Sequence, residues 1–389
     1  MVAALEQILE RAVPLEAEPV SLDAAAGRVL ASGARACVDL PPFPSSAMDG
    51  FVLRSVDTPG TLPIVFRIAA GRPSPRVLER GEAMEISTGG VVPVGADAVV
   101  PLEQAVADAG RVRIEAAAAG AHVRPRGGDL RRGDLVAAAG IRLGAGQLGA
   151  LAAAGLERVA CARRPRAALL STGTELRPPG AVLGDGEIYD ANGVMLAAAL
   201  ASAGAEVERL GPVSDDEGAH REALERGLAA DVLVTSGGVS VGSHDLVRRV
   251  AGELGVEEVF WGVAVKPGKP LSFGVRDATL VFGLPGNPVS SLVAFELFVR
   301  PALAALQGLE DPGPHFRRGR ADRPLRRNPH RDELLRARSF ERDGEVVLDP
   351  VGGQESHMIA RAASADTLAL VPRGEGELAG GTSVRYLPF

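Results

Sequence analysis

The stretch DVLVTSGGVSVGSHD, residues 231–245, decides the fold. Its apolar run Val232 to Thr235 predicts a buried strand, its glycines predict a turn, and an amphipathic run from Asp245 to Leu254 predicts a helix. The same alternation of strands and helices extends from Ala167 to Leu306. Strands separated by helices need crossover connections, so we expect a three-layer αβα domain with a mostly parallel sheet covered on both faces.

The sequence on either side of this alternation predicts three further units. Short β-rich runs bounded by Gly, Pro or Asp fill residues 37–137, and helical patterns cover Val2 to Leu30 and a second stretch near Gly146. A Pro-, Gly- and Arg-rich connector is followed by short alternating strands to the end of the chain. The predicted domains are a discontinuous helical linking domain (1–36 and 138–163), an inserted β-rich domain (37–137), the α/β domain (164–308) and a C-terminal β-barrel-like domain (309–389).

The composition argues against several classes of protein. A formal net charge of −7 disfavours a nucleic-acid-binding protein, because such proteins hold phosphates with basic surfaces. The two cysteines, Cys37 and Cys161, have no neighbouring ligand pattern, which fits a reducing compartment. The chain starts without a basic export signal, and the small-apolar run from Met195 to Ala205 is too short to cross a bilayer. We therefore expect a cytoplasmic protein without membrane contact.

Polar loops follow several predicted strands of the α/β domain, where ligands of open sheets bind. In the loop of residues 235–242, Ser236, Gly237, Gly238 and Ser240 either form a simple turn or bring backbone N–H groups close to an anion. Asp245, at the start of the next predicted helix, either is an ordinary first-turn acid or holds a divalent cation.

Three more loops in this domain differ in how strongly they indicate a ligand-binding site. Glu175 follows the first strand in STGTE, which is weak evidence because a plain turn explains it. The loop KPGKP fixes Lys266 and Lys269 on a turn stiffened by prolines, which suits gripping one anion, although lysines usually lie on a solvated surface. The loop GLPGNPVS, with Pro285 and Pro288, reads as a turn, an Asn N-cap and a Pro at the first helical position, without need of a function.

The six histidines show no paired ligand spacing, which argues against a histidine-bound transition metal. In the β-rich domain, the loops that contain Asp49, Thr88 and Asp129 are each explained most simply as turns.

The whole set of loops resembles one known family. The segments are, in order, SSAMDGF, ISTGG with PVGADAVV, RPRGGD, STGTEL, GEIYDANG, TSGGVSVGSHD, KPGKP and GLPGNPVS. Together they resemble the molybdopterin molybdenumtransferase family, which includes MoeA and the gephyrin E domain, and the match covers essentially the whole chain. The resemblance implies an elongated homodimer of four-domain subunits, with the site between the α/β domain of one subunit and the β-rich domain of the other.

The resemblance also implies an activity. Adenylylated molybdopterin binds, molybdate is placed at its dithiolene, and the pyrophosphate bond is hydrolysed to release AMP, with Mg²⁺ assisting. It implies that the partner's β-rich domain supplies Asp49, Thr88 and Asp129 as catalytic residues. Carboxylates hold hard cations and orient water, so the catalytic residues implied on the α/β side are also the metal ligands: Glu175, Asp215 and Asp245.

Further residues would bind the substrate. The resemblance implies that the loops contribute Ser236, Gly237, Gly238, Ser240, Lys266, Lys269, Pro285 and Pro288, and the C-terminal domain Arg336 and Ser356. The chain departs from the family at Thr174, where Asp is common, and at Gly262, where some members have Lys.

Two other functions stay open. The chain could be a molybdopterin adenylyltransferase or a related nucleotide pyrophosphatase, but adenylyltransferases of this fold carry a GGTG-type loop where this chain has Gly237-Gly238-Val239-Ser240. It could also be a non-catalytic scaffold, as eukaryotic relatives cluster receptors, but no appended partner-binding segment is recognisable. The adenylyltransferase itself is a possible protein partner.

Overall fold

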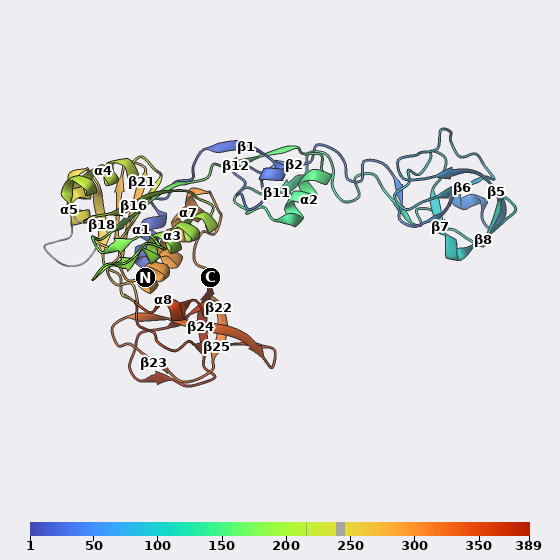
Figure 1. The fold of residues 1–389 in the computed structure, drawn as a ribbon. Helices are drawn as coiled ribbons and strands as arrows, with labels where there is room; N and C mark the ends of the chain where they lie inside the picture. Colours follow the sequence, from blue (N-terminus) through green and yellow to red (C-terminus); the bar gives the residue numbers. More distant parts are fainter. Residues whose placement is uncertain (215, 239–245) are drawn as a thin grey trace.

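The computed structural model describes residues 1–214, 216–238 and 246–389, and Figure 1 shows an elongated chain. The β-rich domain lies at one end of the molecule and the α/β domain at the other, with the linking domain between them and the C-terminal domain beside the α/β domain.

The α/β domain is built on a sheet of six strands in the order β16-β13-β17-β21-β20-β18. The first four strands are parallel, whereas β20 and β18 run antiparallel to their neighbours. Their bounds are β13 (Arg166–Thr172), β16 (Glu206–Val213), β17 (Val232–Ser236), β18 (Glu257–Trp261), β20 (Ser272–Arg276) and β21 (Thr279–Leu284). The predicted mostly parallel sheet is therefore confirmed, but β20 was not predicted. The sequence pattern from Glu258 to Val265 also predicts one strand, but β18 ends at Trp261, because Gly262 turns the chain with a φ of 85°.

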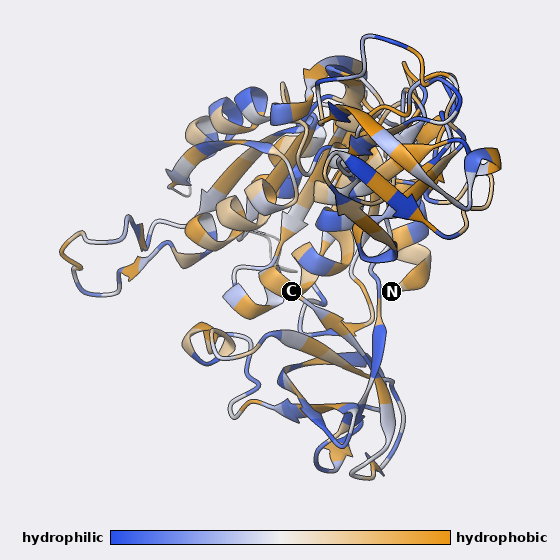
Figure 2. Cartoon of the chain, turned by 90° about the vertical axis from the view of Figure 1, so that its right-hand side faces the viewer, coloured by the Kyte–Doolittle hydropathy of each residue, from blue (hydrophilic) through white to orange (hydrophobic). Residues whose placement is uncertain are grey.

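Helices cover both faces of this sheet, as predicted. Alternate residues of β13 point to opposite faces: Leu169 packs in a core with helix α3 (Ala191–Ser202), and Leu170 packs in a core with α4 (Glu217–Gly227) and α5 (Leu246–Glu253). Figure 2 shows hydrophobic residues along the strands and hydrophilic residues on the outer helices. A helical segment of three parts lies on the α3 side: α6 (Pro288–Ala294), a π-helical turn η4 (Phe295–Val299) and α7 (Arg300–Leu306).

This last segment, Pro288–Leu306, is long and apolar enough to cross a membrane, and it is longer than the run considered from sequence. However, 83% of its most apolar window is buried inside the structure. The central helix of a globular domain has the same properties.

The first helix departs from expectation in length and position. Helix α1 covers only Val2–Leu9, because Pro14 and Pro19 cannot continue a helix. Its buried Ile8 belongs to the core of the α/β domain, and α1 contacts α7 instead of packing beside the second predicted helix.

The linking domain contains more strand than predicted. Strand β1 (Ala17–Ser21) pairs with β12 (Arg158–Ala162), and β2 (Ala34–Arg35) pairs with β11 (Leu135–Ala137). These strands and helix α2 (Ala145–Ala153) share a small core. Two passages of the chain, far apart in sequence, thus lie side by side and carry the β-rich domain between them.

The β-rich domain holds a six-stranded sheet in the order β7-β4-β6-β5-β9-β8. The strands are β4 (Gly50–Leu53), β5 (Gly60–Ile68), β6 (Ala83–Ile86), β7 (Ala98–Pro101), β8 (Ala105–Asp108) and β9 (Arg111–Ile114), with a separate pair β3 (Ser45–Ser46) and β10 (Val123–Arg124).

The C-terminal domain is a closed barrel, which confirms its predicted class. The order β24-β25-β22-β28-β26 closes because β26 also pairs with β24. A strand from the α/β domain, β19 (Val265–Lys266), pairs with β24 from outside the ring. The barrel elements are β22 (Arg317–Ala321), β24 (Asp332–Arg342), β25 (Glu345–Pro350), β26 (Thr367–Val371) and β28 (Ser383–Pro388), with the short pair β23 (Leu325–Arg326) and β27 (Glu377–Leu378) and helix α8 (Ile359–Ala362).

Candidate active site

A hollow of about 700 Å³, here called the strand-end hollow, lies at the carboxyl ends of β13, β17 and β21. The chain passes from β13 to β16 on one side and then to β17 on the other side of β13, so this edge is the switch point where open α/β sheets bind ligands. Its described lining comes from residues 171–173, 175, 176, 188–192, 236–238, 270, 285–288 and 357.

Glycines allow the strand ends to approach each other closely. Gly237 has a φ of 95°, and a Cβ atom there would lie 2.8 Å from the carbonyl oxygen of Thr172. Its N–H donates a hydrogen bond of 3.1 Å to the carbonyl of Leu284. A side chain at Gly237 would therefore push β13 away from β17, so the predicted turn has a structural reason as well as a position suited to a ligand.

Asn192, at the start of α3, projects a polar group into this region. Asp190 caps the helix by accepting a hydrogen bond of 2.7 Å from the N–H of Gly193. The Asn192 Nδ2 donates at 2.7 Å to the Ser236 hydroxyl and at 2.7 Å to the carbonyl of Gly286. A carbonyl can only accept, so these bonds fix the orientation of the amide. The opposite atom, Oδ1, is buried without a partner among the described residues, which is costly unless a ligand satisfies it.

The strand-end hollow has no Lys or Arg among the lining residues that the structure describes. Its described lining includes the acidic residues Glu175 and Asp190. The donors for an anion are therefore backbone N–H groups, since α3 begins beside Asn192 and α6 begins at Pro288. An anion bound here would therefore be held mainly by main-chain donors and hydroxyls.

The structure brings six predicted residues together around this hollow: Glu175, Ser236, Gly237, Gly238, Pro285 and Pro288. Glu175 is exposed, whereas Ser236 is buried beneath the hollow. Three other predicted residues, Asp215, Ser240 and Asp245, lie outside the described residues.

The two predicted lysines do not line the strand-end hollow. The Lys266 Nζ lies 2.8 Å from a carboxylate oxygen of Glu333, because β19 pairs with β24 in a register that sets these residues opposite each other. Lys266 instead lines a hollow of about 400 Å³ with Arg323, Arg326 and Arg327. Lys269 is exposed on the following turn.

Arg336 is fully buried and holds a loop of the barrel. Its guanidinium donates to the carbonyls of Gly353 at 2.7 Å and Met358 at 3.1 Å, and burial lowers its pKa. Arg336 thus acts on the loop that carries Ser356, whose carbonyl accepts a 3.1 Å bond from the N–H of Val289 in α6. This contact fixes the barrel loop against the mouth of the strand-end hollow, where the adjacent His357 is part of the lining.

The predicted residues of the β-rich domain lie far from the strand-end hollow of the same chain (Figure 1). Asp49 and Thr88 meet, as the Thr88 N–H donates a 2.7 Å bond to the Asp49 carboxylate. Asp129 is exposed on another loop, with its N–H bonded to the carbonyl of Leu40 at 3.0 Å. A second copy of the chain would be needed to bring these residues to the hollow.

Oxygen atoms suited to Mg²⁺ are present at the hollow. The exposed carboxylate of Glu175 and the unpartnered Oδ1 of Asn192 both belong to its lining residues. Mg²⁺ commonly uses one or two protein oxygens and completes its shell with water and substrate phosphates. Within the described ranges, no group of three His, Cys, Asp or Glu side chains could hold a metal, so a cation at this hollow would take most of its ligands from water and the substrate.

Asn192 and His357 were missed as site residues. The segment that contains Asn192 was recognised only as part of the family resemblance. Asp190 before an apolar helical run is a helix-start signal, and a polar residue just inside that start is a candidate for the site. No local signal marks His357, because its place depends on how the barrel docks.

Comparisons with known proteins agree with this architecture. Residues 1–155 match "MoeA N-terminal region (domain I and II)", residues 168–305 match "Probable molybdopterin binding domain" and residues 318–389 match "MoeA C-terminal region (domain IV)". The chain therefore belongs to the MoeA family of molybdopterin molybdenumtransferases.

Individual relatives are similar over nearly their whole length. The chain is 37% identical to "Molybdopterin molybdenumtransferase 2" of Mycobacterium tuberculosis, covering 94% of this chain and 93% of the relative. It is 33% identical to "Molybdopterin molybdenumtransferase" of Haemophilus influenzae, covering 97% and 95%. The crystal structure of a molybdopterin biosynthesis MoeA protein from Pyrococcus horikoshii has a TM-score of 0.83 and 32% identity, covering 100% of this chain and 98% of that one.

Proposed function

We propose that this chain is an enzyme of molybdenum cofactor biosynthesis that inserts molybdate into adenylylated molybdopterin and releases AMP. The observation that carries the proposal is the strand-end hollow, lined by glycine loops, hydroxyls and two helix starts, in a chain whose relatives are named molybdopterin molybdenumtransferases. The pyrophosphate of the substrate suits such main-chain donors, and the volume of about 700 Å³ suits a small nucleotide-like ligand.

Different residues of the chain would bind the phosphates, hold the cation and orient the attacking water. Gly237 and Gly238 let the backbone approach the phosphates, and the Ser236 hydroxyl, oriented by Asn192, donates to a phosphate oxygen. Glu175 and Asn192 Oδ1, with Asp215 and Asp245 expected from the resemblance, would hold Mg²⁺. When bound, that ion would neutralise phosphate charge and act as a Lewis acid. Glu175 orients the water that attacks phosphorus.

The direct test is the release of AMP from adenylylated molybdopterin, with and without molybdate. Molybdate-dependent release of AMP supports insertion. Formation of adenylylated molybdopterin from ATP would instead support an adenylyltransferase, AMP release indifferent to molybdate would support a pyrophosphatase, and no turnover by the folded protein would support a scaffold.

We also propose that the active form is a homodimer with shared sites. The support is the separation within one chain between the strand-end hollow and the Asp49–Thr88 pair. Asp49→Asn and Glu175→Gln variants, each inactive alone, should regain up to about a quarter of wild-type activity after subunit exchange, because one site in a mixed dimer is intact. Absence of recovery after exchange has been verified by mass spectrometry would contradict the shared site.

The same proposal places the enzyme in the cytoplasm. The molybdopterin adenylyltransferase, which makes the substrate, is the expected delivery partner.

A further inference from the structure

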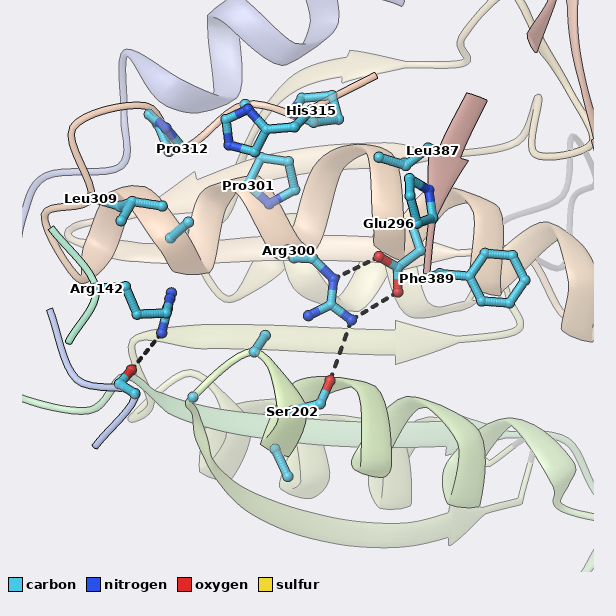
Figure 3. Close-up of a pocket in the computed structure, with 18 of the residues that line it drawn as sticks. Arg142, Ser202, Glu296, Arg300, Pro301, Leu309, Pro312, His315, Leu387 and Phe389 are labelled. Carbon is cyan, nitrogen blue, oxygen red and sulfur yellow. Dashed lines mark hydrogen bonds and ion pairs between the residues drawn. The ribbon is translucent and has the colours of Figure 1, made fainter. Parts of the chain in front are cut away.

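A second hollow, here called the junction hollow, lies where the linking, α/β and C-terminal domains meet. It has a volume of about 640 Å³ and none of the residues proposed above for the reaction lines it. Figure 3 shows its walls: Arg142 comes from the linking domain, Arg300 from α7, His315 from the connector, and Phe389 follows the last barrel strand.

Arginine side chains dominate the charge of this hollow. Arg142, Arg164, Arg300 and Arg317 line it, and Glu296 is the one acidic side chain among its described lining residues. Glu296 is already paired, because its two carboxylate oxygens accept hydrogen bonds of 2.6 and 2.9 Å from Arg300. For the other three guanidinium groups, the described lining holds no further acidic side chain.

These groups retain donors for a ligand. Arg142 donates at 2.7 Å to the carbonyl of Gly27, and Arg164 donates at 3.4 Å to that of Gly204. A guanidinium carries five N–H donors, so each keeps several. Although Arg142 is exposed, partial desolvation lowers its pKa, and the positive charges of Arg300 and Arg164 lower it further, in keeping with the four arginines that line this hollow. In a protein of net charge −7, such an arrangement stabilises a bound anion.

The helix wall of the hollow has an unusual backbone. The π-helical turn Phe295–Val299 interrupts the helix at Glu296, and π-turns are rare features found frequently at functional sites. The turn lies beside the Glu296–Arg300 pair, and Arg300 also donates at 3.3 Å to the hydroxyl of Ser202 in α3 (Figure 3). This network fixes one guanidinium rigidly across the floor of the hollow.

Apolar groups form the remaining wall. Leu309, Pro312, Leu387 and Phe389 all line the hollow. An inorganic anion would leave this surface in contact with water, whereas a ligand with an apolar body would cover it.

We propose that the junction hollow binds a small organic anion that joins a phosphate or carboxylate group to an apolar or aromatic body. Its volume lies within the range of about 300–1,000 Å³ usual for such ligands. Because the walls belong to three domains, the ligand binds best when they have the arrangement described here and so favours that arrangement. The site is thus suited to sensing a metabolite away from the strand-end hollow.

Phenyl phosphate is the probe, with binding to the full chain measured by isothermal titration calorimetry. We expect one saturable site per chain and a rise in melting temperature with ligand concentration. The Arg142→Gln/Arg164→Gln variant should bind at least about tenfold more weakly, since two charge-assisted hydrogen-bonding groups are lost. Arg113→Gln, which removes an exposed arginine of the β-rich domain, is the matched control and should bind like the wild type.

Several outcomes would overturn the site. They are no saturable binding by the wild type, unchanged affinity in the double variant, or an equal loss in Ser236→Ala, which would place the probe in the strand-end hollow. If circular dichroism shows that the double variant is unfolded, Arg317→Gln decides, because this exposed side chain can be replaced without a folding cost. Weaker binding by Arg317→Gln supports the proposal and unchanged binding overturns it.

Inorganic phosphate should bind more weakly than phenyl phosphate. Equal affinity for the two would contradict the proposed contact between the ligand's apolar body and the apolar wall of the junction hollow.

Discussion

The strand-end hollow and the junction hollow have similar volumes, about 700 and 640 Å³, but opposite ways of attracting an anion. The first offers N–H groups, hydroxyls and glycine turns without an arginine or lysine in its described lining. The second offers four arginines around one paired glutamate. Main-chain donors are fixed in direction and suit a reaction that must hold phosphates in one geometry. Guanidinium groups on long side chains instead suit binding of a phosphate or carboxylate by charge together with paired hydrogen bonds.

The sharpest test of this contrast is Glu175→Gln. Its exposed carboxylate belongs to the strand-end hollow, so we expect molybdate-dependent AMP release to fall about 100-fold, because the substitution removes a charged group that orients water. Asp185→Asn is the matched control, since Asp185 is exposed in the same segment of the chain without lining the hollow, and it should keep wild-type turnover. Equal turnover by the two variants would mean that Glu175 has no part in the chemistry.

A second test asks whether Lys266 contacts the substrate although its ammonium group is paired with Glu333 in the structure. Of the 42 cationic residues of the chain, only Lys266 and Lys269 are lysines. Lys266→Gln should raise the KM for molybdate about tenfold if the ammonium moves to the anion during turnover. Stability should change by no more than about 1 kcal/mol, as is usual for a partly exposed ion pair.

Glu333→Gln separates the two roles of this lysine. It breaks the same 2.8 Å ion pair but leaves the ammonium in place. The KM of Glu333→Gln for molybdate should match that of the wild type. If its KM rises as much as that of Lys266→Gln, the role of Lys266 is to pair β19 with the barrel and not to bind molybdate.

The smallest expected effect compares two adjacent arginines. Arg164 lines the junction hollow, whereas its neighbour Arg163 donates to Asp231 at 2.6 and 2.7 Å. Burial alone would raise the pKa of Asp231, but hydrogen bonds from Arg163 and from the N–H of Arg166 lower it overall, below its ordinary value. A carboxylate with a lowered folded-state pKa stabilises the fold above its unfolded pKa, and this contribution is lost as the pH falls through the folded value.

Asp231→Asn should therefore lower the free energy of unfolding by about 1 kcal/mol at pH 7, and the difference from the wild type should shrink below about pH 4. Urea unfolding at several pH values measures this. Arg164→Gln should leave the unfolding free energy nearly unchanged at both extremes, because Arg164 has no ion pair in the described chain. A deficit of Asp231→Asn that stays constant with pH would show that packing, not charge, stabilises this corner.

The sequence predicted the parts that depend on local patterns. The parallel strands and helices between Ala167 and Leu306 follow from hydrophobic periodicity, and so does the edge where Ser236 and Pro285 meet. The same reasoning overestimated the first helix, although Pro14 and Pro19 marked its end. It also missed β20, a short strand that follows directly after a proline-rich turn.

Non-local contacts set the remaining features. Lys266 and Lys269 were expected to bind one anion together. However, β19 pairs with β24, which lies far later in the chain, and this pairing sets Lys266 beside Glu333. Arg336 was expected to bind the substrate, and the structure shows that it is buried and donates hydrogen bonds to carbonyls of a barrel loop. The junction hollow could not be predicted from the sequence, because its arginines come from four separated segments that meet only when the domains pack together.

The pairing of β2 with β11 has a practical consequence for engineering. Arg35 lies opposite Leu135 on adjacent antiparallel strands, so the inserted β-rich domain leaves and re-enters the linking domain about 5 Å apart. A tight turn between these two positions would excise the whole insert without crossing another connection. The catalytic half and the half expected to serve the opposite subunit could then be produced and recombined as separate parts.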